Sequence, residues 1–179
     1  ISGPSGAGEG ARVAGVRVRR SNRGLTVSAA TLAPRPGEVD GVNYFFLTRE
    51  EFDRRVANGE FVEWAEVHGN CYGTLVSEVT SKLASGSSLI LEIDVQGALQ
   101  VKERFPEAVL IFIKPPSLEV LRERLVGRGT ETPETIELRM ANAADELALA
   151  DRYDDVVVND DLDRATDELV RVLDMHERI

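Results

Sequence analysis

A short stretch near the start of the chain, "GPSGAGEGA", has the glycine spacing of a phosphate-binding loop. Such a loop is written G-x-x-x-x-G-K-[ST], and it holds phosphates with backbone amides, a lysine and a hydroxyl. Here Gly3 and Gly8 keep the glycine positions, but Glu9 stands where the lysine is expected, and Gly10 and Ala11 offer no hydroxyl. A unit charge pair about 4 Å apart is worth about 4 kcal/mol at an effective dielectric of about 20. A glutamate in place of the lysine exchanges attraction for repulsion and therefore disfavours a bound triphosphate.

The composition of the 179-residue chain limits what kind of protein it can be. Its 42% apolar content can build the core of one α/β domain with a small insertion. No stretch approaches the roughly 20 apolar residues of a membrane span. The single cysteine, Cys71, excludes an internal disulfide, and without a signal-peptide pattern we expect a cytoplasmic protein. The net charge of −10 argues against a nucleic-acid-binding surface, so local arginines must hold any anionic ligand.

The second half of the chain alternates strands and helices. Strands are predicted at 87–95, at 108–114 and in "DDVVVND". Helices are predicted after the first of these strands to about Phe105, after Ser117, at about 133–151 and at the end of the chain. The run 87–95 is apolar and ends in acids, which is typical of a buried parallel strand with functional groups at its carboxyl end. With a strand that ends in "IS" before the glycine loop, these elements predict an α/β fold with a doubly wound parallel sheet.

The part of the chain between the loop and this alternation has a different pattern. It contains predicted strands at 25–30 and 42–47, a capped helix at 48–59, short strands within 60–75 and a helix at 76–86. Residues 31–84 are therefore the candidate insertion.

From Leu25 to its end the chain contains the segments "SAATLAPRPGEVDGVNY", "FVEWAEVHGNCYGT", "LEIDVQGA", "IFIKPPS", "RERLVGRGTE" and "VVVNDDLD". In their order and spacing these segments resemble the guanylate kinases, which transfer a phosphoryl group from ATP to GMP. The resemblance implies a P-loop core formed by 1–30 and 85–179, with a short lid at about 123–135 and a GMP-binding subdomain at 31–84. It also implies Mg²⁺ with ATP, the small-molecule substrates GMP and ATP, no nucleic-acid or membrane partner, and a monomer or homodimer.

The resemblance assigns one group of residues to GMP. The base is read by Ser28, Glu63 and Thr74, and the phosphate is held by Arg35, Tyr44 and Tyr72. Glu38 and Glu92 are assigned to the same site. Leu32 stands where the family pattern has a second arginine. The loss of one charge-assisted bond of ~1.5–3 kcal/mol predicts weaker GMP binding.

A second group of residues is assigned to ATP and to catalysis. The catalytic residues are Arg124, Arg128, Arg139 and Asp94. The ATP-binding loop comprises Gly3, Pro4, Ser5, Gly6, Ala7, Gly8, Glu9 and Gly10. Asn159 is assigned to the adenine, and Mg²⁺ is held through the phosphates near Asp94 without a direct protein ligand. The alternative for each arginine is an ordinary exposed helix charge paired with Glu123 or Glu137.

The resemblance fails over residues 9–24. This block contains five arginines, and Gly15 among several valines makes it a poor helix. A compensated frameshift explains one contiguous departure better than scattered divergence does. The alternative function is a non-catalytic guanylate-kinase-like module that binds phosphorylated partners. Such a module has little reason to keep the lid arginines and Asp94, so we expect an enzyme whose activity is impaired by Glu9, Ala11 and Leu32.

Overall fold

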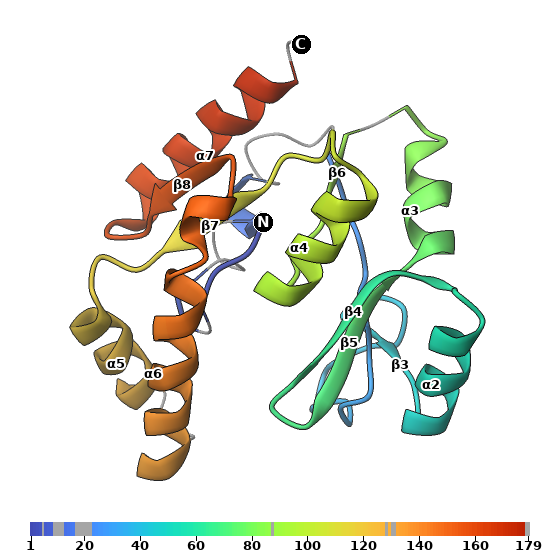
Figure 1. Cartoon of the computed structure of the whole chain (residues 1–179), viewed down its shortest axis with the longest axis horizontal. Coiled ribbons are helices and arrows are strands. Elements are labelled where there is room, and N and C mark those ends of the chain that lie inside the picture. Colours follow the sequence, from blue (N-terminus) through green and yellow to red (C-terminus); the bar gives the residue numbers. More distant parts are fainter. Residues whose placement is uncertain are drawn as a thin grey trace. The chain divides into compact units, whose positions relative to one another are not determined.

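The computed structural model describes residues 1–4, 6–8, 13–16, 23–86, 88–127, 129 and 132–177. Four residues of the predicted site, Ser5, Glu9, Gly10 and Arg128, lie outside these ranges. The chain divides into two compact units: a terminal unit of Ile1–Ser21 with Glu107–Ile179, and a central unit of Asn22–Pro106. Figure 1 labels elements of both units. The insertion expected at 31–84 falls within the central unit, and its bounds stay a prediction.

The terminal unit is built on parallel strand pairing. Its elements are β7 (Ile111–Lys114), α5 (Leu118–Gly127), α6 (Pro133–Leu147), the 3₁₀ helix η1 (Ala150–Arg152), β8 (Asp155–Val158) and α7 (Leu162–His176). Strand β7 pairs in parallel with β8, and Ser2 forms a parallel bridge to Phe112 of β7. Three successive residues of β7, from Ile111 to Ile113, are buried, as expected for a parallel strand covered on both faces.

Residues 13–16 are helical although the sequence made this segment a poor helix candidate. Val13 and Val16 are buried and lie one turn apart, so they supply the apolar face that the pattern did not reveal. A Cβ on Gly15 would lie 2.9 Å from Cγ2 of Thr166 on α7. The glycine that counted against a helix therefore permits a close approach between this turn and α7.

The central unit combines a mixed sheet with a separate parallel strand pair. Its elements are β1 (Gly24–Leu25), β2 (Ala29–Ala30), β3 (Phe45–Phe46), α2 (Arg49–Ala57), β4 (Phe61–Val67), β5 (Asn70–Leu75), α3 (Val76–Leu83), β6 (Leu89–Ile90) and α4 (Val95–Arg104). Strands β3, β2, β5 and β4 lie in that order in one sheet, and β1 pairs in parallel with β6. Parallel pairs alternating with helices confirm the predicted α/β class.

The strand predicted at 25–30 is interrupted between β1 and β2, and two side chains of α3 bind the backbone there. The N–H of Val27 donates to Oε1 of Glu78 at 2.8 Å, and Nζ of Lys82 donates to the carbonyl of Leu25 at 2.5 Å. These side chains replace ladder bonds, which lets the chain leave β6 and join the mixed sheet. The strand predicted at 87–95 is paired only over β6, so the acids that follow it lie beyond the ladder.

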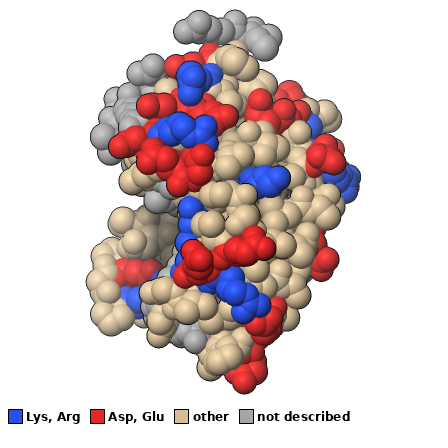
Figure 2. Space-filling model, turned by 90° about the vertical axis from the view of Figure 1, so that its left-hand side faces the viewer, with Lys and Arg blue, Asp and Glu red and all other residues tan. Residues whose placement is uncertain are grey.

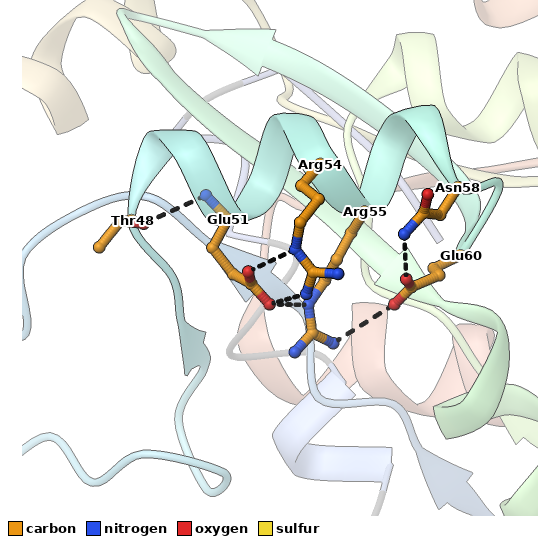
Figure 3. A network of polar contacts seen from close by, with 6 residues as sticks. All are labelled: Thr48, Glu51, Arg54, Arg55, Asn58 and Glu60. Carbon is orange, nitrogen blue, oxygen red and sulfur yellow. Dashed lines mark hydrogen bonds and ion pairs between the residues drawn. The ribbon is translucent and has the colours of Figure 1, made fainter.

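Helix α2 forms from a mostly polar sequence because its side chains bind one another. The Thr48 hydroxyl accepts from the N–H of Glu51 at 3.1 Å and so caps the helix. The Glu51 carboxylate accepts from both Arg54 and Arg55, at 2.7 to 2.9 Å (Figure 3). Phe52 is the buried residue of the helix, and it anchors α2 on the sheet in a cluster with Phe61.

Acidic and basic side chains are interspersed on the face shown in Figure 2. Arg122 lies 2.7 Å from Glu137, and Arg164 lies 2.6 Å from Asp160. Such exposed pairs are worth little stability, about 0–1 kcal/mol each.

No helix among the described residues is long and apolar enough to cross a membrane.

Candidate active site

The glycines of the phosphate-binding loop meet real steric demands. A Cβ on Gly3 would collide with the carbonyl oxygen of Ile113 in β7, so only glycine allows this approach. Gly6 and Gly8 have φ angles of 95° and 89°, a region that side chains with a Cβ rarely adopt. The glycine spacing read from the sequence therefore coincides with positions where the backbone needs glycine.

The carbonyl of Ala7 in this loop is held by two predicted ATP-side residues. Nδ2 of Asn159 donates to it, and Nη1 of Arg124 donates to it at 3.3 Å. Nη2 of Arg124 also donates to the carbonyl of Asn159, at 2.8 Å. Asn159 is buried and follows β8, so its amide fixes the loop against the end of a parallel strand. The structure thus brings Arg124 and Asn159 together at the loop, while Arg139 lies half-buried on α6.

Glu63 and Thr74 form a buried pair across β4 and β5. The Thr74 hydroxyl donates to Oε1 of Glu63 at 2.6 Å, and the two residues are register partners. Only 3% of Glu63 and 0% of Thr74 is exposed. The register of β4 shifts between Phe61 and Glu63, a β-bulge that turns Glu63 into the interior.

Burial strongly changes the acidity of this site. Loss of solvent raises the pKa of Glu63 to about 7, the nearby Asp94 adds to the rise, and the bond from Thr74 opposes it. Burial also raises the pKa values of Asp94 and Glu92 above their ordinary values. Burial therefore makes the charged form of each of these three carboxyl groups of the central unit costly.

Gly97 is a site residue that the sequence reasoning missed. Asp94 caps α4 by accepting from the N–H of Gly97 at 2.7 Å. A Cβ on Gly97 would collide with Oε2 of Glu63 and would lie 3.1 Å from Oδ1 of Asp94. Gly97 thus lets both carboxylates approach the first turn of α4. A glycine inside a predicted helix is the signal that could have revealed it.

The residues predicted to hold the GMP phosphate also lie together. The rings of Tyr44 and Tyr72 have centroids 6.2 Å apart. Burial raises the pKa of Tyr44, the charges of Tyr72, Glu92 and Glu38 raise it further, and Arg35 lowers it. Glu38 accepts from the backbone N–H of Arg35 at 2.8 Å, which orders the loop before β3.

Ser28 and Leu32 flank strand β2 in the same unit. The Ser28 carbonyl accepts from the N–H of Phe45 at 2.9 Å, directly beside Tyr44 in sequence. Leu32 follows Thr31, whose N–H donates to the carbonyl of Cys71 at 3.0 Å and whose hydroxyl accepts from the N–H of Cys71 at 2.9 Å. The backbone at the missing arginine position is therefore fixed against β5.

A family model described as Guanylate kinase matches residues 1–176. The chain belongs to the guanylate kinase family. A guanylate kinase of Gloeobacter violaceus is 54% identical over 173 residues, which cover 97% of this chain and 84% of the relative. One from Halalkalibacterium halodurans is 50% identical, over 97% of this chain and 85% of the relative. The crystal structure of guanylate kinase from Anaplasma phagocytophilum is 36% identical, covers 97% of this chain and 82% of that chain, and has a TM-score of 0.77.

Membership of the guanylate kinase family confirms the resemblance that the motifs from Leu25 onward carried. The matched region also includes residues 9–24, where the motifs departed from the family pattern. The guanylate kinase assignment thus holds for nearly the whole chain. The roles predicted for individual residues remain predictions.

Proposed function

We propose that this protein transfers the γ-phosphoryl group of ATP to GMP, giving ADP and GDP. The buried pair of Glu63 and Thr74 is the observation that carries the substrate assignment. Guanine presents hydrogens on N1 and N2, and a carboxylate can accept hydrogen bonds from both. The hydroxyl of Thr74 offers the base one further polar contact. Adenine lacks the N1 hydrogen, so an adenine in this site leaves a buried acceptor unpaired at a cost of ~1–3 kcal/mol. Ser28 completes the proposed base site.

The proposed phosphate site is formed by Arg35, Tyr44 and Tyr72. Arg35 is exposed and its guanidinium offers forked donors, while the rings of the two tyrosines, one just before β3 and the other on β5, have centroids 6.2 Å apart. Glu38 fixes the loop that carries Arg35. In this proposal the base and the phosphate are read by separate residues, so the two recognitions can be tested separately.

The proposed ATP site is the glycine loop with Arg124, Arg128 and Arg139. Phosphoryl transfer makes little covalent demand on a protein, because catalysis consists of positioning and of neutralising charge on the moving group. Arg124 contacts the loop through Ala7. We propose that the three arginines neutralise the charge on the transferred phosphoryl group. Asn159 is assigned to the adenine side of the loop.

The proposed cofactor is Mg²⁺ that enters with ATP. Among the described residues, no group of three His, Cys, Asp or Glu side chains could hold a metal, so the phosphates would supply most of its ligands. The half-buried carboxylate of Asp94 is the type of oxygen acceptor that would bind the Mg²⁺ through a water molecule. Bound Mg²⁺ neutralises charge on the β- and γ-phosphates. We place the reaction in the cytoplasm.

A coupled assay for ADP formation with ATP, Mg²⁺ and GMP tests the activity. ADP that forms with GMP and not with AMP is the expected result. Because Glu9 is expected to slow turnover, titration calorimetry with GMP and AMP tests the base site independently. Equal affinity for the two nucleotides would remove the guanine assignment whatever the rate of turnover.

A further inference from the structure

Helix α4 directs one row of residues toward β4. Asp94 caps this helix, and Gly97, Gln100 and Arg104 follow at intervals of three and four residues, which places them on one face. Strand β4 lies at an edge of the sheet in the order β3-β2-β5-β4, so its outer backbone groups can bind side-chain partners.

Gln100 binds both backbone groups of Trp64. The N–H of Trp64 donates to Oε1 of Gln100 at 3.1 Å, and Nε2 of Gln100 donates to the carbonyl of Trp64 at 2.7 Å. A primary amide can donate and accept at once, so Gln100 takes the place that a neighbouring strand would occupy. Trp64 directly follows Glu63, and this clamp therefore fixes the strand beside the carboxylate.

The other side of Glu63 is also held from α4. Nη1 of Arg104 donates to the carbonyl of Phe61 at 2.9 Å and to that of Val62 at 3.3 Å. These carbonyls belong to the β-bulge, where the ladder is interrupted. Phe61, Val62 and Glu63 are buried in succession, so the bulge is what turns Glu63 inward. Helix α4 thus holds β4 on both sides of this residue.

We propose that Gln100 is a specificity-determining positioning residue, which holds the Glu63 carboxylate in place to read guanine through its clamp on Trp64. The inference rests on the proposed role of Glu63. It adds that base selectivity depends on a residue that touches neither nucleotide. The residues proposed for the phosphate lie outside β4, so loss of the clamp weakens recognition of the base and spares that of the phosphate.

The test compares dissociation constants for GMP and AMP, measured by titration calorimetry. Gln100→Met keeps the side-chain length and removes both hydrogen bonds to Trp64. Glu103→Met changes an exposed residue of the same helix and is the matched control. Gln100→Met is expected to weaken GMP binding about tenfold and AMP binding by less than about twofold, because one charge-assisted bond to the base is lost. Gln100→Asn keeps the amide on a shorter side chain, and it is expected to weaken GMP and AMP binding by the same factors as Gln100→Met.

Glu63→Gln measured in parallel separates failure of this inference from failure of the proposed function. If Glu63→Gln abolishes the preference for GMP and both Gln100 variants keep it, the positioning role is wrong and the base site stands. If the unchanged protein has no preference, both are wrong. If the Gln100 variants weaken GMP and AMP equally and lower the melting temperature, Gln100 serves stability alone and the inference is overturned.

Discussion

The hydroxyl of Thr74 lies 2.6 Å from Oε1 of Glu63, and both side chains are buried on neighbouring strands. The bond favours the ionised carboxylate, but burial and the nearby charge of Asp94 outweigh it and raise the Glu63 pKa to about 7. The residue proposed to read guanine therefore changes its protonation state near neutral pH.

Because Glu63 changes its protonation state near neutral pH, selectivity for GMP is expected to depend on pH. Only the carboxylate form of Glu63 accepts from both N1 and N2 of guanine, so protonation competes with GMP binding below about pH 7. The ratio of GMP affinity to AMP affinity is expected to rise about tenfold between about pH 6 and about pH 8. The ratio cancels the titration of the phosphate, which both nucleotides share. Titration calorimetry at several pH values measures it, and a flat ratio would contradict the assignment of Glu63.

The same pKa predicts how Glu63→Gln changes stability. The folded pKa of about 7 lies above the ordinary value of 4.5 for a glutamate, so the carboxyl costs no stability below pH 4.5 and costs progressively more as the pH rises to about 7. This rise in the Glu63 pKa corresponds to about 3 kcal/mol. Glu63→Gln is therefore expected to stabilise the nucleotide-free protein by up to about 3 kcal/mol above pH 7 and to change little near pH 4.5. Urea unfolding at the two pH values measures the difference, and a destabilised variant above pH 7 would contradict it.

Loss of the Asn159 amide is expected to lower the stability of the terminal unit. The amide is buried and donates to the carbonyl of Ala7, so Asn159→Ala leaves that carbonyl with the weaker bond from Arg124. The expected loss in the free energy of unfolding is about 1–3 kcal/mol. Asn58→Ala, at an exposed amide bonded to Glu60, is the control and is expected to cost less than about 0.5 kcal/mol. Equal losses in the two variants would contradict a structural role for Asn159 at the loop.

Sequence patterns predicted the elements more accurately than their pairing. Thr48 before a run of acids correctly predicted the capped start of α2 at Arg49. The strand expected at 25–30 is broken, because Glu78 and Lys82 of α3 bind its backbone at Val27 and Leu25. Side chains 51 and 57 residues away make these contacts, and no local pattern could show them.

The candidate site shows the same limit. Motifs identified Glu63 and Thr74, and the structure places them in hydrogen-bonding contact. They did not identify Gly97 or the clamp from Gln100, because both depend on the close approach of α4 to β4. Buried valines at 13 and 16 likewise formed a helical turn that propensity disfavoured, since tertiary packing overrides weak local preferences.

Leu32→Arg is predicted to strengthen GMP binding. The backbone before this position is fixed by the bonds between Thr31 and Cys71, so an arginine can replace the leucine without a change in the strand. An added charge-assisted bond of ~1.5–3 kcal/mol should raise GMP affinity roughly tenfold to a hundredfold. AMP affinity should rise equally, because the new group contacts the phosphate. Leu83→Arg, at an exposed position on α3, adds the same charge as a control. A gain in both variants would indicate a general charge effect.

Glu9→Lys is predicted to give the largest gain in activity. The lysine of a phosphate-binding loop attracts the β- and γ-phosphates, and the glutamate in its place repels them. At about 4 kcal/mol for each unit charge pair, the exchange recovers several kcal/mol before screening. Each ~1.4 kcal/mol recovered in the transition state is a tenfold gain in rate, so ATP-dependent phosphorylation of GMP should rise at least about a hundredfold. The coupled ADP assay measures this change.

Two comparisons make the Glu9 prediction specific. Glu103→Lys reverses the same charge at an exposed site on α4, and its activity should match that of the unchanged protein. GMP affinity should be unaffected by Glu9→Lys, because the glycine loop and the GMP residues are proposed to bind different nucleotides. If the unchanged protein already turns over at an ordinary kinase rate, the glutamate does not impair the loop. If Glu9→Lys folds normally by circular dichroism and gains no activity, the defect lies elsewhere, and Ala11 is the next position to change.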